Sequence, residues 1–214
     1  MHENWLSSKV DLLGRIRALA SKRRLQDLTI GPVLSVTTAD LLKHTQRLAG
    51  IPGASVVCGG RELRGHSIPP QYGAVEPTAV FVPLKQILEK EHFEACATEV
   101  FGPFQVITSY TDAELPLVLE ACERMSHHLT AGIVSSDICF IQKILGATVN
   151  GVTYVGRRAR TTGAPQWHSF GPAGDPRGAQ IGTYEAIRSV WSCHREIVQD
   201  FGPVPPSWKA PPTM

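Results

Sequence analysis

The sequence lacks several features that would define the protein class at once. No apolar run approaches the roughly 20 residues that a membrane-spanning helix needs, because charge, Gly or Pro interrupts every hydrophobic stretch. Cysteine is scarce: the chain has 5, widely spaced and without a C-x-x-C pair, which argues against a disulfide scaffold and a zinc ribbon. We therefore expect a protein of a reducing compartment with no membrane partner.

Common catalytic signatures are missing as well. The chain has no G-x-G-x-x-G after a strand, no G-x-x-x-x-G-K-[ST], no H-E-x-x-H and no G-x-S-x-G. The histidines are scattered, so we expect no metal site. Lys and Arg number 21 against 19 Asp and Glu, and the net charge of +2 gives no reason to expect a nucleic-acid partner.

Basic residues gather on the outer face of the first expected helix. Such a patch can bind phosphate, but Asp11 and Asp27 lie nearby and no aromatic residues interleave. We therefore expect a solvated helix face. The basic residues are Lys9, Arg15, Arg17, Lys22, Arg23 and Arg24.

Hydrophobic periodicity predicts helices that alternate with strands. Apolar positions at helical spacing predict helices over residues 4–24, 37–49, 111–125, 138–145 and 183–198. Short β-branched runs predict strands over residues 54–58, 78–82, 104–110, 129–134 and 147–152. Since parallel strands need crossover connections that helices usually supply, we expect an α/β fold with an open parallel sheet and flanking helices.

Local signals mark some of the boundaries. Thr37 with Asp40 and Thr111 with Glu114 have the spacing of capping boxes, which open helices. Residues 157–182 are rich in Gly and Pro and too long for an idle connector, which favours a functional loop. We expect an α/β domain over residues 1–156, a functional loop and last helix over 157–200, and a Pro-rich tail over 201–214.

One segment carries a specific resemblance. Residues 98–104, TEVFGPF, resemble the Glu-[Ile/Val]-Phe-Gly-Pro signature of the aldehyde dehydrogenase superfamily. Four further segments resemble motifs of that family in the same order along the chain: Gly31-Pro32-Val33, Glu76-Pro77-Thr78, the strand from Leu129 to Ile133, and Thr148-Val149-Asn150-Gly151. The fold that this resemblance implies is a truncated catalytic-domain α/β sheet.

Three later segments resemble the plant-type Δ1-pyrroline-5-carboxylate dehydrogenases within this superfamily. They lie over residues 158–166, 170–178 and 191–196. The resemblance implies oxidation of a small-molecule aldehyde, glutamate γ-semialdehyde, to glutamate with NAD, in the last step of proline catabolism. It also implies a homo-oligomer of the mitochondrial matrix, although the first residues contain no targeting segment.

The resemblance assigns two cofactor-binding residues. It implies that Glu99 hydrogen-bonds the nicotinamide ribose and that Phe101 packs beside the nicotinamide ring. Residues two apart on an extended segment face the same way, which suits this pair of roles. The alternative is that Glu99 caps a turn and Phe101 is ordinary core.

The resemblance also points to the loop that holds the far end of the aldehyde. Backbone N–H groups at glycines and a nearby Arg are the expected partners of an α-amino carboxylate. The candidates are Gly171, Gly174, Arg177, Gly178 and Ala179. In the alternative interpretation the glycines only permit turns and Arg177 is solvated.

No catalytic residue is assigned. The family attacks its aldehyde with a thiolate in a Gly-Gln-x-Cys-like segment, and none of the five cysteines has that context. By resemblance, the cofactor domain and the general-base Glu also precede the region that this chain matches. We expect Met1 to be an internal methionine of a longer enzyme and the chain to be inactive alone. The alternative is a non-catalytic α/β interaction or regulatory module.

Overall fold

The computed structural model describes residues 1–126, 128, 130–150, 152–156 and 206–207. The chain divides into two compact units, one containing Met1–Ser126 with Ser135–Val149 and the other His127–Val134 with Asn150–Met214. The expected helix over 183–198 and most of the loop and tail lie outside the described residues. In the part of the chain that is described, no helix is long and apolar enough to cross a membrane.

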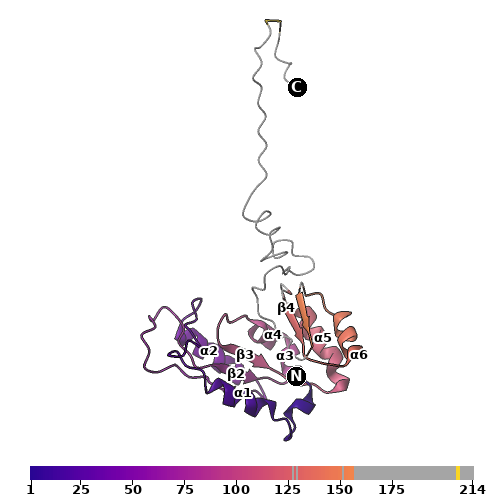
Figure 1. Ribbon diagram of the computed structural model, residues 1–214, viewed down its shortest axis with the longest axis horizontal. Coiled ribbons are helices and arrows are strands. Elements are labelled where there is room, and N and C mark those ends of the chain that lie inside the picture. Colours follow the sequence, from indigo (N-terminus) through magenta and orange to yellow (C-terminus); the bar gives the residue numbers. More distant parts are fainter. Residues whose placement is uncertain (127, 129, 151, 157–205, 208–214) are drawn as a thin grey trace. The chain divides into compact units, whose positions relative to one another are not determined.

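A three-stranded sheet forms the centre of the first unit (Figure 1). Its order is β1 (Ser55–Cys58), β2 (Thr78–Phe81), β3 (Phe104–Ile107). Strand β2 is buried along most of its length, which suits a run of Thr, Ala, Val and Phe between two neighbours. The predicted α/β class is confirmed, and β2 pairs with β3 in parallel as expected.

Strand β1 departs from the parallel expectation. It runs antiparallel to β2, with a register shift between Val56 and Cys58. The physical reason is the connection: residues 59–77 contain no helix and return as a long arm, so no crossover unit separates the two strands. The arm is closed at its base by a bridge between Glu62 and Val75 and by an Arg61–Glu76 ion pair at 3.0 Å.

Three helices cover one face of this sheet. They are α2 (Thr38–Ala49), α3 (Leu84–Leu88) and α4 (Lys90–Ala97). Their apolar side chains form the largest buried cluster with the sheet, made of Leu48, Ile51, Val80, Val82, Ile87 and Ala95. The sequence analysis did not anticipate α3 and α4, because two short helices separated at Glu89 leave no long apolar period.

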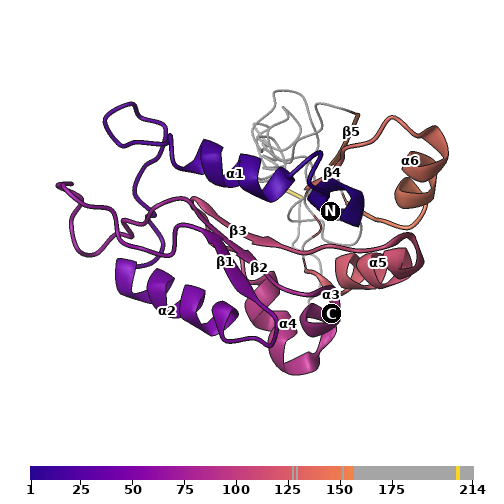
Figure 2. The same ribbon diagram turned by 90° about the horizontal axis from the view of Figure 1, so that it is seen from below.

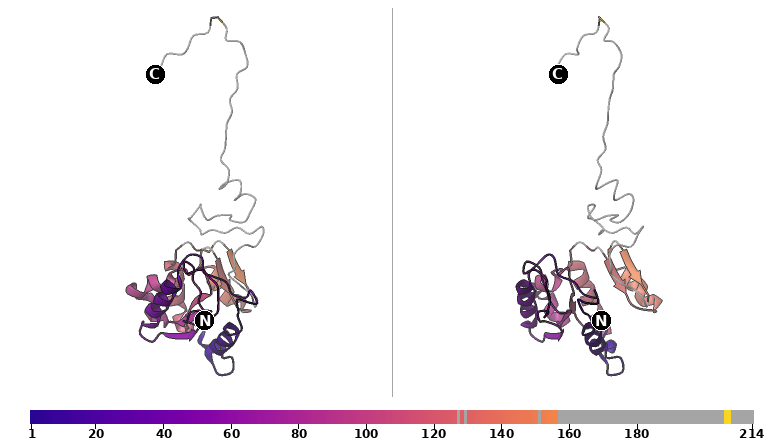
Figure 3. Two further views of the ribbon diagram at one scale, coloured as in Figure 1. Left: turned by 90° about the vertical axis from the view of Figure 1, so that its left-hand side faces the viewer. Right: turned by 60° about the vertical axis from the view of Figure 1, so that its left-hand side comes forward.

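The opposite face is covered by α1 (Leu12–Ala20), as Figures 2 and 3 show from three sides. Leu13 and Ile16 of α1 pack against buried Val57 and Ile107 of the sheet. The Arg17 side chain donates a hydrogen bond to the Val57 carbonyl at 2.8 Å. The first unit is therefore a sheet between two helical layers.

The expected single helix over residues 4–24 is wrong. A 3-10 turn over Glu3–Leu6 is separated from α1 by Asp11, whose backbone is left-handed at φ 43°. The Asp11 carboxylate accepts a hydrogen bond from the Gly14 N–H, so the residue acts as an N-cap and restarts the helix. The apolar period alone did not reveal this break.

Both predicted capping boxes are confirmed. Thr37 and Asp40 bond each other's backbone N–H groups at the start of α2. Thr111 and Glu114 do the same before α5 (Leu115–Arg124), through a short 3-10 turn. Helix starts with this reciprocal bonding satisfy donors that would otherwise lack a partner.

Strands β4 (Thr130–Ile133) and β5 (Val152–Val155) form a parallel pair in the second unit. The strand expected over 147–152 therefore begins later than predicted. Helix α6 (Ile138–Leu145) explains the shift, because the Ala147 N–H and the Thr148 hydroxyl both donate to the Ile144 carbonyl and extend its last turn. Helix-type bonding thus occupies the start of the predicted strand.

Truncation of two leucines should change the stability of the fold by very different amounts. Leu48 is fully buried, whereas Leu34 is 69% exposed. We expect Leu48→Ala to lower the free energy of unfolding by about 2–5 kcal/mol and Leu34→Ala by less than about 0.5 kcal/mol. Urea unfolding followed by circular dichroism measures both, and equal losses would contradict the described core.

Candidate functional site

The segment between α4 and β3 holds the two candidate cofactor-binding residues on the surface. Glu99 is exposed, and Phe101 leaves 80% of its surface in solvent. Val100, between them, packs against the buried cluster of Val33, Leu41 and Val75. Exposed Glu99, partly buried Val100 and exposed Phe101 thus alternate along the segment. Phe101 is therefore not the ordinary core residue of the alternative interpretation.

Two tight turns fix this segment. The Gly102 N–H donates to the Val100 carbonyl at 2.7 Å, and the Phe104 N–H donates to the Gly102 carbonyl at 2.8 Å. Hydrogen bonds across two residues define γ-turns, and since Phe101 is absent from the residues with positive φ, its turn is of the inverse type. The Phe101 ring therefore projects from a backbone with little conformational freedom.

Gly102 makes a close approach that no other residue allows. A Cβ at this position would lie 2.4 Å from Cγ2 of Val33, well inside contact distance. Val33 is itself fixed by a reciprocal pair of backbone hydrogen bonds with Gly73, each 2.8 Å long. The glycine thus lets the exposed segment rest directly on a buried side chain.

Three of the five family-like segments meet at this point. Val33 belongs to the Gly-Pro-Val segment, and it contacts Gly102 of the Glu-Val-Phe-Gly-Pro segment. Thr78, at the start of β2, donates its N–H to the Pro103 carbonyl at 2.8 Å. Segments up to about 70 residues apart along the chain therefore pack against one another here.

His44 packs against Phe104, the residue that ends the second turn. The sequence did not predict this contact. The His44 ring lies 5.3 Å from the Phe104 ring, and its Nε2 is buried with no hydrogen-bond partner among the residues that the structure describes. Burial, followed by the charge of Arg47, lowers the pKa of His44. The only signal in the sequence was its helical spacing beside Leu41, Thr45 and Leu48, which does not separate a core histidine from a solvated one.

Two of the described cysteines, Cys96 and Cys122, do not have the character of a nucleophile. Burial raises the pKa of the Cys96 and Cys122 thiols, whereas a reactive thiol needs its pKa lowered. Cys58 is half-buried at the end of β1, and Cys139 is exposed at the start of α6. Cys193 lies outside the described residues.

Neither the candidate substrate-binding residues nor a metal site is found among the described residues. All five proposed substrate-binding residues, Gly171, Gly174, Arg177, Gly178 and Ala179, lie outside the described residues, so that hypothesis stays a prediction. Across the residues that the structure describes, no group of three His, Cys, Asp or Glu side chains is arranged to hold a metal ion.

Comparison with known sequences gives a consistent family. The model of the aldehyde dehydrogenase family matches residues 7–174. A probable aldehyde dehydrogenase from Linum usitatissimum is 58% identical over 213 residues, and the mitochondrial Delta-1-pyrroline-5-carboxylate dehydrogenase 12A1 of Arabidopsis thaliana is 57% identical over 214 residues. Each alignment covers 100% of this chain but only 38% of the relative.

Solved structures share the fold at low sequence identity. A putative aldehyde dehydrogenase from Burkholderia cenocepacia matches with a TM-score of 0.60 and 22% identity, covering 81% of this chain and 33% of that structure. PnpE from Pseudomonas sp. WBC-3, in complex with nicotinamide adenine dinucleotide, matches with a TM-score of 0.59 and 19% identity, covering 87% and 36%. The fold described above is therefore a part of a larger known one.

The two phenylalanines of the segment should respond differently to truncation. Phe101 is exposed, whereas Phe104 packs against the main buried cluster and His44. We expect Phe101→Ala to change the free energy of unfolding by less than about 0.5 kcal/mol and Phe104→Ala to lower it by about 2–4 kcal/mol. Denaturant unfolding measures both, and a large loss for Phe101→Ala would show that its ring is part of the core.

His44 should make stability depend on pH. Because its pKa is lowered in the fold, the unfolded chain binds the proton more readily, so protonation favours unfolding. The free energy of unfolding should fall as the pH drops below about 6.5 and should be insensitive to His44 above it. We expect His44→Gln to reduce the slope of stability against pH over this window, and an unchanged slope would contradict the role assigned to the buried ring.

Proposed function

Because the chain belongs to the aldehyde dehydrogenase family, we propose that it supplies the nicotinamide-side part of an NAD-dependent enzyme that oxidises glutamate γ-semialdehyde to glutamate. The 57% identity to a relative named Delta-1-pyrroline-5-carboxylate dehydrogenase supports the choice of substrate. The single structural observation that carries the proposal is the exposed Phe101 ring, 80% in solvent, at the centre of an inverse γ-turn two residues after exposed Glu99.

The described residues fit the cofactor's chemistry. NAD+ accepts the hydride in this reaction. An exposed carboxylate such as that of Glu99 accepts hydrogen bonds from ribose hydroxyl groups. An exposed aromatic ring such as that of Phe101 packs on a flat heterocycle and excludes water from it. The turn centred on Phe101 places its ring without further loss of backbone freedom on binding, which favours affinity.

We propose that the nucleophile comes from outside the described residues. The chain spans 38% of the length of its curated relatives, and the thiols whose pKa shifts are resolved have raised pKa values. We expect the chain alone to form no NADH. We propose that the whole enzyme is a homo-oligomer of the mitochondrial matrix, a location suggested by the name of the Arabidopsis relative.

A second candidate needs no nucleophile in the chain, which is compatible with the raised pKa values of the Cys96 and Cys122 thiols. In this candidate, the chain is a non-catalytic α/β module that binds full-length subunits of its own family. The two candidates share a fold and differ in chemistry. Cysteine-dependent NADH formation by the purified chain would exclude the non-catalytic module.

A chimera tests the proposed function directly. Residues 1–214 replace the matching region of the Arabidopsis relative, which the chain matches without loss of length. We expect NAD-dependent oxidation of glutamate γ-semialdehyde by the chimera, and a fall of at least about tenfold in kcat/KM for NAD in the Glu99→Ala variant. Absorbance of NADH measures both rates.

A matched glutamate provides the control. Glu94 is exposed on α4, a few residues from Glu99, and Glu94→Ala should leave the kcat/KM for NAD unchanged. A folded chimera that forms no NADH from glutamate γ-semialdehyde would refute the proposed substrate or the proposed part of this chain in the NAD-dependent enzyme. Equal kcat/KM values for Glu99→Ala and the parent would refute the role of Glu99.

A further inference from the structure

The segment that follows α1 is a closed loop with an unusual residue at its tip. The Thr29 N–H donates to the Arg24 carbonyl at 3.1 Å, and the Leu28 N–H donates to the Leu25 carbonyl at 3.0 Å. These nested bonds are those of a Schellman motif. The Arg24 N–H also donates to the Thr29 hydroxyl at 2.8 Å, which closes the base of the loop a second time.

Leu28 occupies the position at which this motif prefers glycine. Its backbone is left-handed at φ 53°, a conformation in which a leucine is strained. Asp11 also has a positive φ, but it bonds locally through its carboxylate, whereas a leucine side chain has no such compensation. Packing does not compensate for this strain either, because Leu28 is 91% exposed.

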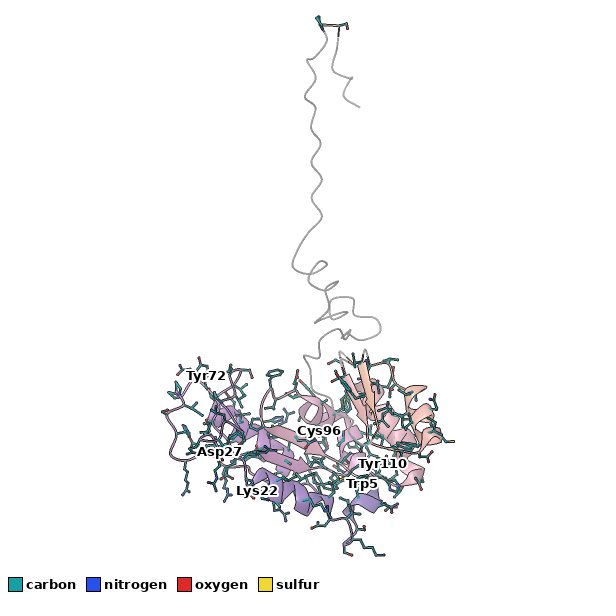
Figure 4. The ribbon with its side chains drawn as sticks, viewed as in Figure 1. Trp5, Lys22, Asp27, Tyr72, Cys96 and Tyr110 are labelled. Carbon is teal, nitrogen blue, oxygen red and sulfur yellow. The ribbon has the colours of Figure 1, made fainter. Side chains whose placement is uncertain are left out.

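Three cations precede this tip along the chain, at the end of α1 and the base of the loop. Lys22, Arg23 and Arg24 are all exposed, and within the described part of the chain none of them joins a salt bridge. Asp27 is the acidic residue of the loop, so the segment from 22 to 29 keeps a positive charge. Figure 2 shows the loop running out past the end of α1, and Figure 4 labels Lys22 and Asp27 on it.

We propose that residues 22–29 form a docking loop for an anionic phospholipid surface. Leu28 inserts among the acyl chains, and Lys22, Arg23 and Arg24 pair with lipid phosphates around it. Strain in an exposed leucine points to a function outside the fold. An exposed apolar residue a few positions after a run of basic residues is a combination that favours the membrane interface.

The shape of the loop favours a bilayer over a protein partner. A stable protein interface buries about 800 Å² on each side, and one projecting leucine offers far less than that. A bilayer needs no complementary pocket, because insertion depends only on apolar area and on charge. The inference concerns a surface separate from Glu99 and Phe101, so it stands or fails independently of the proposed function.

Vesicle sedimentation tests the proposal with the 214-residue chain. The protein is mixed with vesicles of phosphatidylcholine alone or of phosphatidylcholine with phosphatidylglycerol. We expect binding to the anionic vesicles only, weakened by added salt. Binding to neither vesicle, or equal binding to both, would overturn the proposal and leave the loop to a protein partner.

Leu28→Gly separates docking from folding. Glycine suits the left-handed position, so the thermal midpoint should stay the same or rise, while vesicle affinity should fall by about tenfold. The control is Leu34→Gly, which removes an exposed leucine outside the loop and should leave affinity unchanged. Wild-type affinity in Leu28→Gly would overturn the role of the tip.

A second pair of variants tests the cations. Replacing Lys22, Arg23 and Arg24 together by Gln should abolish binding to anionic vesicles. The matched control replaces three exposed lysines elsewhere, Lys43, Lys90 and Lys143, by Gln and carries the same net charge. Equal loss in both triple variants would show that net charge, rather than this loop, governs the binding.

Discussion

The contact between Gly102 and Val33 is the constraint on which the candidate site depends. Any side chain at position 102 would collide with Val33, so only glycine lets the exposed segment lie on the core. The same segment contains the two γ-turns and accepts the hydrogen bond from the Thr78 N–H at the Pro103 carbonyl. A buried valine thus lies directly beneath the segment that carries exposed Phe101, which links the packing of the core to the surface that carries the candidate residues.

The sequence predicted those parts of the fold that local chemistry specifies. Both capping boxes formed, because a Thr and a carboxylate three residues later satisfy each other whatever lies around them. The parallel pairing of β2 with β3 also followed from alternation. The antiparallel β1 and the helices α3 and α4 did not follow, because strand direction depends on a long arm and short helices carry little period.

For the site, the sequence indicated residues and the structure supplied the geometry. Glu99 and Phe101 came from a resemblance, and spacing alone left Phe101 as easily in the core as on the surface. Its exposure depends on backbone turns that involve Gly102 and Pro103. His44 escaped notice because an unpartnered imidazole nitrogen is a property of its surroundings, which no local pattern records.

The bulge in β1 has a consequence for the protein in a crowded solution. Val57 is the residue that the register between β1 and β2 skips, and its carbonyl accepts the hydrogen bond from Arg17. In the described sheet, β1 is an edge strand, whose unpaired groups would otherwise template the addition of another chain. A bulge bends such an edge, and a charged side chain that occupies its carbonyl removes an acceptor. One arginine therefore lowers the tendency of this edge to recruit strands into an aggregate.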